Sequence, residues 1–275
     1  MALVPFPTKG AQPALTDDPE PDWDDPDHEG GGGKMSFLDH LDELRRRIIY
    51  SLVGVVLGFC VTIFFVEDLF RFILAPMQVG LAPGQTMIYT DPGEAFFLKI
   101  KIALMAGLIL AGPIVFSQVW LFVAPGLYAH EKKLAIPFIV MSSVFFAAGA
   151  VFSHYVVFPI VWQFFAAQAT DIVTFTPRVE PAYAMYLRLI LALGLTFELP
   201  TVVLFLARMG MITPRFMIRN IKYAVLIIIA LAAVLSPDGG GVGMLAMGGP
   251  VVLLYIFSIG LAWLFGKKRK KPEDE

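Results

Sequence analysis

Charged residues are scarce in this sequence, and cysteine is almost absent. Charged side chains make up 16% of the 275 residues and hydrophobic side chains 57%, with a mean hydropathy of +0.72. These values lie far to the apolar side of a soluble globular domain, so we expect a lipid bilayer as the solvent. Cys60 is the only cysteine, which excludes an intrachain disulfide and a cysteine-based metal cluster. Because Cys60 lies in an apolar run, we expect a buried, inert thiol.

Sequence motifs of soluble enzymes are missing as well. The histidines are spread over separate segments without the spacing of a metal site. No Gly-x-Ser-x-Gly elbow is present, and the glycines of 30–33 have no strand before them and so do not form a phosphate-binding loop. An intramembrane protease would need a base facing its nucleophile, and Ser258 has none in its helix. We predict no catalytic site, no metal and no cofactor.

The amino-terminal stretch differs from the rest of the chain. Residues 1–34 are acidic and rich in proline and glycine, a composition that cannot bury a core and is typical of disorder. They lack the basic start, apolar core and cleavage site of a secretory signal peptide. We predict a disordered acidic tail over 1–34, a membrane domain over 35–265 and a charged cytoplasmic tail over 266–275. Met35 is a second candidate for the translation start.

Six apolar segments follow the tail. Runs near 20 residues are predicted to be helices, because a backbone in lipid must satisfy its own hydrogen bonds. The fifth run is short, since 12 residues reach about 18 Å against a ~30 Å hydrocarbon core. In the sixth, the Gly-Gly-Pro of 248–250 is expected to leave only 251–265 helical. The expected spans lie at 48–66, 102–123, 134–158, 189–207, 224–235 and 243–265.

The positive charges predict the orientation. Sixteen of the 21 Lys and Arg residues fall on the side of the two termini, and five fall on the other side. The positive-inside rule then places both termini in the cytoplasm, which requires an even number of spans. The external connection 67–95 contains proline and glycine turns, and we expect it to be a folded cap, while the other external connection, 159–183, contains prolines.

Two glutamates stand out at the basic, cytoplasmic side. Glu43 lies on an amphipathic helix that is expected to begin near Phe37 at the interface and to continue into the first span. Glu131 lies in a tight connection after the second span. Each is either a binding residue facing a cytoplasmic groove or simply a local ion-pair partner, of Arg47 and Lys132 respectively.

The fourth apolar segment contains an ionisable residue, Glu198. Insertion of such a group costs up to ~2.5 to 3.5 kcal/mol, so it normally faces a partner or a wet cavity. Pro200 follows it and predicts a bend. Gln118, Gln163 and His154 are softer cases, which we interpret as hydrogen-bonding residues between helices or as interface residues.

Five motifs in order over about 36–265 closely resemble the TatC family, the core of the twin-arginine protein translocase. They are HLDELRRR at 40–47, QVWLFVAPGLY at 118–128, HE at 130–131, FELP at 197–200 and SPD at 236–238. One departure is the run at 239–242, GGGV, where the family often has a glutamine shortly after the aspartate. A partner contact there is in doubt.

The resemblance implies a fold and a function. It implies an all-α membrane protein with six transmembrane helices in a concave bundle, both termini inside, and short fifth and sixth spans. It also implies a receptor in the bacterial cytoplasmic membrane for the twin-arginine signal peptides of folded precursors. TatA- and TatB-type single-span subunits would be its partners in proton-motive-force-driven export. It implies a homo-oligomer within a receptor complex, no enzyme activity and no nucleic acid.

Roles for individual residues also come from the resemblance. Family roles assign the capture of the twin arginines to Glu43 and Glu131, with Leu41, Arg45 and Phe122 near that site. Glu198 corresponds to the family's intramembrane carboxylate, while Pro76 and Asp238 correspond to external-side positions. Arginine binds carboxylate as a planar fork that lysine cannot copy, so two carboxylates suit a double-arginine signal.

Two other functions stay open. A six-span ion-coupled transporter would use Glu198 as its proton or cation site, although the sequence shows no internal repeat that would favour it. A structural anchor would only assemble partners.

Overall fold

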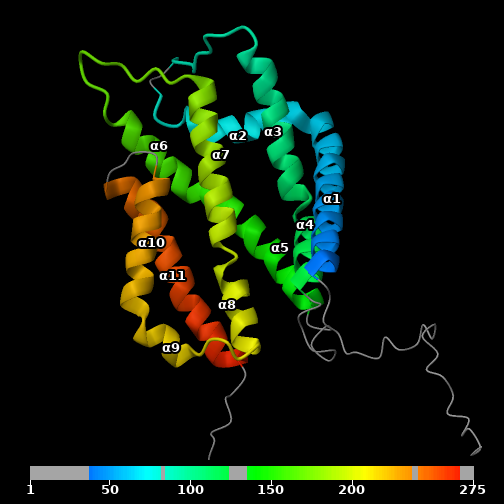
Figure 1. The fold of residues 1–275 in the computed structure, drawn as a ribbon. Coiled ribbons are helices and arrows are strands. Elements are labelled where there is room, and N and C mark those ends of the chain that lie inside the picture. The colour runs from blue at the N-terminus through cyan, green and yellow to red at the C-terminus, as the bar shows by residue number, and fades with distance from the viewer. Residues whose placement is uncertain (1–36, 82–83, 124–134, 237–240, 267–275) are drawn as a thin grey trace, which may run out of the picture. The chain divides into compact units, whose positions relative to one another are not determined.

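The computed structural model describes residues 37–81, 84–123, 135–236 and 241–266, and Figure 1 shows their helices. Regular structure in this part of the chain is helical, with two isolated bridges and no strand. Residues from Asp42 onward form one compact unit, separate from residues up to Leu41. The tail predicted for 1–34 and nearly all of the one predicted for 266–275 lie outside the described residues.

The first apolar segment belongs to a longer helix. Helix α1, Phe37–Thr62, runs from the predicted interface helix into the span without a break. A short turn, Ile63–Phe65, leads to α2, Val66–Gln78, which turns away from the α1 axis (Figure 1). Helix α2 buries an apolar side that includes Met77 and Pro76. The expected cap therefore begins with a helix.

The second apolar segment is bent. Helices α3, Glu94–Leu110, and α4, Gly112–Val123, meet at an angle of 53°. Pro113, which lacks an amide hydrogen, is the second residue of α4 and interrupts the hydrogen-bond ladder. One predicted straight helix is thus two helices.

The third segment is a run of helix with a wide turn in it. Helices α5, Ala135–Phe152, and α6, Phe158–Ala166, are joined by a π-helical turn, Ser153–Val157. Such turns insert one extra residue into a helix. Helix α6 extends past the predicted end of the span into the second external connection.

The fourth segment breaks where Pro200 predicted a bend. Helix α7, Val179–Thr196, begins ten residues before the expected start, and α8 is Leu199–Arg208. Glu198 lies in the break, directly before α8. The short helix α9, Pro214–Arg219, follows.

The last two helices form a hairpin and correct one prediction. Helix α10, Ile221–Leu235, has 15 residues, so the short fifth span is confirmed. Helix α11, Gly241–Phe265, has 25 residues, about 37 Å. The short sixth span was therefore wrong. Pro250 lies inside α11. A proline removes only one backbone hydrogen bond from a helix, and the two glycines before Pro250 have no side chains that would add a steric clash.

Among the described residues, four helices are long and apolar enough to cross a membrane, and a fifth span is present if the bent α3–α4 pair counts as one. Helix α10 is a shorter apolar helix beside them. An all-helical chain with several apolar spans confirms the expected fold class, while the count of six spans stays a prediction.

The core lies between α2, α3, α6 and α7, where Met77, Leu98, Phe158 and Tyr186 are almost fully buried. Helix α1 crosses α3 so closely at Gly58 that a Cβ there would lie 2.4 Å from the Gly107 oxygen. Small residues at such crossings are a recurring feature of membrane helices. Cys60, on the same helix, is exposed, so the buried thiol expected from its apolar neighbours was wrong. In a membrane helix, residues that face the lipid are apolar as well, so apolar neighbours in the sequence do not show that a residue is buried in the protein.

Candidate functional site

Glu43 is already paired in the structure. It lies near the start of α1, with its side chain 18% exposed, and its Oε1 accepts a hydrogen bond from Arg47 Nη2 at 3.1 Å. The two residues are four apart, so their side chains meet on one helix face. The local ion pair that the sequence left open for Glu43 is therefore present.

Arg47 also joins α1 to α4. Its Nη1 donates to Gln118 Oε1 at 3.2 Å, which confirms that Gln118 bonds between helices. Glu43 Oε2 and Arg47 Nε are buried and have no hydrogen-bond partner. A buried polar atom left unpaired costs about 1 to 3 kcal/mol. The pair thus keeps the capacity to accept a further donor.

The other residues expected near Glu43 are only partly brought together. Arg45 is exposed and lines a surface hollow of about 350 Å³ with Asp42 and Tyr50. Phe122 lies one turn beyond Gln118 on α4 and is half-buried. Leu41 belongs to the separate first unit and is exposed. Glu131 falls outside the described residues, so its approach to Glu43 stays a prediction.

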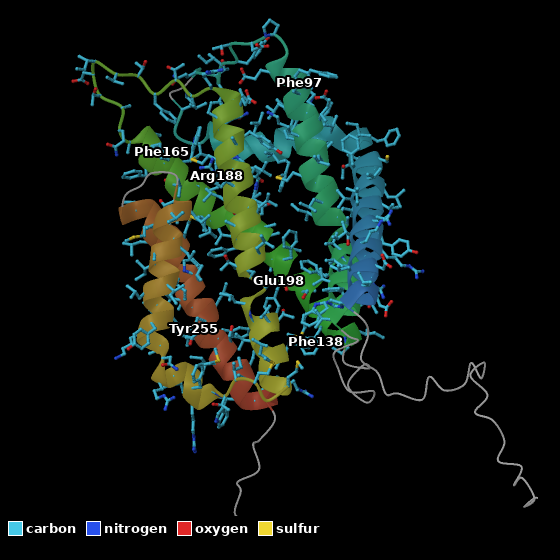
Figure 2. The ribbon with its side chains drawn as sticks, in the orientation of Figure 1. Phe97, Phe138, Phe165, Arg188, Glu198 and Tyr255 are labelled. Atoms are coloured by element: carbon cyan, nitrogen blue, oxygen red, sulfur yellow. The ribbon has the colours of Figure 1, made fainter. Side chains whose placement is uncertain are left out.

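Glu198 lies at the break between α7 and α8 (Figure 2). Its Oε1 is buried without a hydrogen-bond partner. On two neighbouring helices, Trp120 Nε1 of α4 donates to Ser142 Oγ of α5 at 2.9 Å. The expectation that Glu198 faces a partner or a wet cavity stays a prediction.

Trp120 of α4 contacts two further helices, α5 and α8. Its ring stacks on Phe138 of α5, with centroids 4.9 Å apart, and meets the edge of Phe205 of α8 at 5.0 Å. Sequence reasoning missed both Trp120 and Ser142. The indole was the available signal, because a buried tryptophan N–H usually needs an acceptor.

The two connections that are predicted to be external form a folded cap. Ile88 pairs with the 177–179 backbone through two hydrogen bonds of 3.2 and 3.0 Å. Glu94, whose side chain is 1% exposed, accepts the backbone N–H groups of Thr90 and Glu180 at 3.1 and 2.9 Å. Sequence reasoning missed Glu94, although an acidic residue after the Asp-Pro-Gly of 91–93 could have indicated a helix start. Pro76 is buried in α2 beneath this region, and Asp238 falls outside the described residues.

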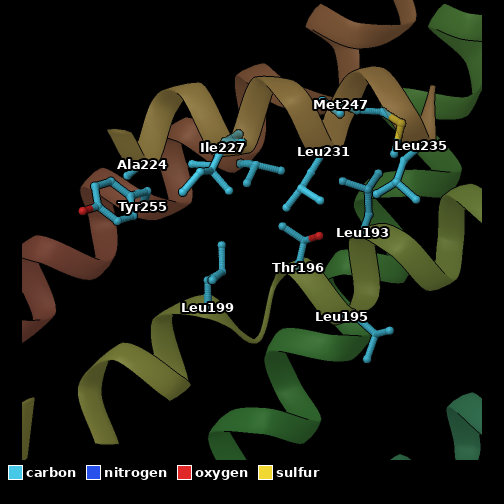
Figure 3. A pocket seen from close by; sticks show the side chains of 13 residues that line it. Leu193, Leu195, Thr196, Leu199, Ala224, Ile227, Leu231, Leu235, Met247 and Tyr255 are labelled. Atoms are coloured by element: carbon cyan, nitrogen blue, oxygen red, sulfur yellow. The ribbon is translucent and has the colours of Figure 1, made fainter. Parts of the chain in front are cut away.

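An apolar cavity of about 400 Å³ lies between the α7–α8 break, α10 and α11 (Figure 3). Thr196 and Leu199, on either side of the break, line it together with Leu231 of α10 and Met247 of α11. The lining suits an apolar ligand. Among the described residues no group of three or more His, Cys, Asp or Glu could hold a metal ion.

The fold and these sites define a multi-pass α-helical membrane protein with polar groups held at helix breaks. Residues 39–250 match the family described as Sec-independent protein translocase protein (TatC), and the chain belongs to that family. This is a family of translocase components and not of enzymes.

Relatives and solved structures agree with this membership. A TatC protein of Desulforapulum autotrophicum is 39% identical over 242 residues, covering 88% of this chain and 89% of that protein. The Escherichia coli K12 TatC is 32% identical over 241 residues, covering 86% and 92%. A crystal structure of the twin-arginine translocase receptor TatC in DDM has a TM-score of 0.72 at 32% identity, covering 83% of this chain and all of that one. The chain is thus a multi-pass protein of the bacterial inner membrane.

Proposed function

We propose that this chain is the core subunit of a twin-arginine translocase. It binds the twin-arginine signal peptide of folded precursors at the cytoplasmic face. With TatA- and TatB-type single-span subunits it exports them by using the proton-motive force. The observation that carries the proposal is Glu43, a mostly buried carboxylate with one unpaired oxygen at the polar end of α1.

The energetics of arginine capture favour this site. A charge-assisted hydrogen bond contributes ~1.5 to 3 kcal/mol where it is partly shielded, so contacts at Glu43 and Glu131 together give about 3 to 6 kcal/mol. That corresponds to roughly two to four decades in affinity. Solvated pairs are worth only ~0 to 1 kcal/mol each. The 18% exposure of the Glu43 side chain favours the shielded case.

We further propose six spans with both termini in the cytoplasm. The described basic residues Arg208, Arg215 and Arg219 lie at the end of α8 and in α9. Positive charge gathered in this part of the chain supports a cytoplasmic assignment for it. The acidic tail over 1–34 and the charged tail over 266–275 would then lie on the cytoplasmic side.

Partner contact belongs to a second region in this proposal. Glu198, with an unpaired buried oxygen, and the adjacent apolar cavity together suit an apolar helix that carries one polar group. We assign the contact with TatA- or TatB-type subunits and assembly of a homo-oligomeric receptor to this region. Pro76 and Asp238 are proposed external-side contributors.

Crosslinking is the most direct test. A twin-arginine peptide with a photoreactive group should crosslink to the purified protein in nanodiscs, and a paired-lysine peptide should do so weakly. The transporter alternative predicts solute flux in liposomes containing this chain alone, whereas the translocase predicts none. A structural anchor would capture neither peptide.

A further inference from the structure

Helix α4 makes two polar contacts on opposite sides. Gln118 accepts from Arg47 of α1 at 3.2 Å, and Trp120 donates to Ser142 of α5 at 2.9 Å. Residues two apart on a helix point about 200° away from each other. The two contacts therefore hold α4 between α1 and α5.

Each side of α4 leads on to a carboxylate. Arg47 bonds Glu43 at the proposed peptide site. On the other side, the Trp120 ring meets Phe205 of α8, the helix that begins directly after Glu198. Both carboxylates have one buried oxygen without a partner. Two incompletely satisfied acidic groups are thus connected through three residues of one short helix.

The construction of α4 allows it to move. It has 12 residues and leaves α3 at a 53° bend. Ile114, near that bend, packs against Gly54 of α1, where a Cβ would lie only 2.7 Å from the Ile114 methyl group. On the carboxyl-terminal side of Ile114, the hydrogen bond from Arg47 to Gln118 connects α4 to α1, and the Trp120 ring packs on α5 and α8. Loss of the Arg47 tie would leave the end of α4 attached on one side only.

We propose that α4 couples the two carboxylates, so that a ligand arginine at Glu43 displaces Arg47 from Gln118 and shifts Trp120 relative to Ser142 and Glu198. Displacement follows because two guanidinium groups at one carboxylate repel each other. Gln118, Trp120 and Ser142 are positioning residues in this device. The inference rests on the proposed peptide site and adds a mechanism by which occupation of that site alters the region assigned to partners.

Thermodynamic linkage predicts whether loss of a contact of α4 strengthens or weakens peptide binding. A resting contact that breaks on binding opposes binding, and coupling between two sites is reciprocal. Trp120→Phe keeps an aromatic side chain and removes the N–H donor, so it should tighten twin-arginine peptide binding by about two- to tenfold, the value of one hydrogen bond. Ser143→Ala is a matched control. Its hydroxyl bonds Ile139 O within α5 at 2.8 Å, so its loss should leave affinity unchanged.

Tryptophan fluorescence tests the movement directly. In a nanodisc sample that retains Trp120 and carries Phe at 23, 162 and 263, a tryptophan-free twin-arginine peptide should change the emission. The change should saturate at the dissociation constant given by anisotropy of a labelled peptide. A protein that retains only Trp162, buried on α6, should show no change.

The outcomes separate the coupling from the receptor function. Normal peptide binding with unchanged Trp120 emission, or with no gain in affinity for Trp120→Phe, would overturn the coupling and leave the receptor intact. Absence of peptide binding would overturn both. Glu43→Gln should shift the emission change to peptide concentrations about ten- to a hundredfold higher than in the parent protein.

Discussion

At the scale of single residues, Glu43 is both an ion-pair partner in the structure and the carboxylate to which we assign peptide recognition. Arg47 holds its carboxylate by one oxygen in a mostly buried position and leaves the other oxygen unpaired. A ligand at Glu43 has to compete with Arg47, and this competition lowers the affinity of every ligand by the same factor. Selectivity for arginine must therefore come from the geometry of the carboxylates themselves, whose two oxygens match the guanidinium fork.

The first prediction concerns charge at this site. Glu43→Gln keeps size and one acceptor but removes the charge-assisted fork, so twin-arginine affinity should fall by about ten- to a hundredfold. Isothermal titration in nanodiscs measures it. Asp42→Asn, at the exposed neighbouring position, should change affinity by less than about threefold. A paired-lysine peptide should bind poorly and lose little. Equal binding of both peptides, unaffected by Glu43→Gln, would return Glu43 to a purely local ion pair.

A second residue-scale prediction concerns Glu198. In the proposed function Glu198 belongs to the partner-contact region and not to the peptide site, so Glu198→Ala should keep peptide crosslinking and block export. Export of a folded reporter in cells and crosslinking to purified protein measure the two effects. A correctly folded Glu198→Ala protein that no longer crosslinks the peptide would count against a partner role.

At the scale of secondary structure, the sequence predicted which segments are helical and missed how they bend. Apolar runs indicated the helices of the expected spans but not α2, which lies in a predicted connection, and Pro200 indicated the α7–α8 break. The α3–α4 bend and the unbroken α11 were missed, because Pro113 ends a helix in one context and Pro250 is tolerated in another. Hydrogen bonds lost at a proline are replaced by tertiary neighbours, which a sequence does not reveal.

The α1–α3 crossing gives an element-scale prediction. A Cβ at Gly58 would meet the Gly107 backbone oxygen at 2.4 Å, so Gly58→Ala should push the helices apart and cost about 1 to 3 kcal/mol. Thermal unfolding in detergent should show a lower Tm. Gly260→Ala is the control, since nothing lies within 4 Å of a Cβ there. An unchanged Tm for Gly58→Ala would mean that the two helices are less closely packed.

A second element-scale prediction concerns the cap, which the Glu94 carboxylate holds together by hydrogen bonds. Glu94 uses both oxygens to accept backbone N–H groups from two connections, and Glu94→Gln would replace one acceptor by a donor. We expect a lower Tm and faster proteolysis of the cap. Glu67→Gln, at an exposed ion pair with Lys99, should change neither. Similar behaviour of the two variants would show that Glu94 does not organise the cap.

At the scale of the whole molecule, the charge distribution and the proposed function predict the same side of the membrane for Glu43. A receptor for a basic signal must present its carboxylates on the side where precursors are made, although the same side carries most of the positive charge. Sequence reasoning identified Glu43 and Glu198 as unusual because each lies against the local trend in charge or polarity. The residues that connect them were missed, since the contacts of Gln118 and Trp120 depend on the angle at which α4 leaves α3.

Orientation itself can be measured. Cysteine introduced at Thr86 in the cap, in a protein whose exposed Cys60 is changed to Ala, should react with a membrane-impermeant maleimide in intact spheroplasts. Cysteine introduced at Met211, 68% exposed between α8 and α9, should react only after permeabilisation. Neither change alters a lysine or arginine, so the charges that determine topology are preserved. The reverse labelling pattern would place Glu43 outside the cell, where no precursor could reach it before export, and the receptor proposal would then fail as well.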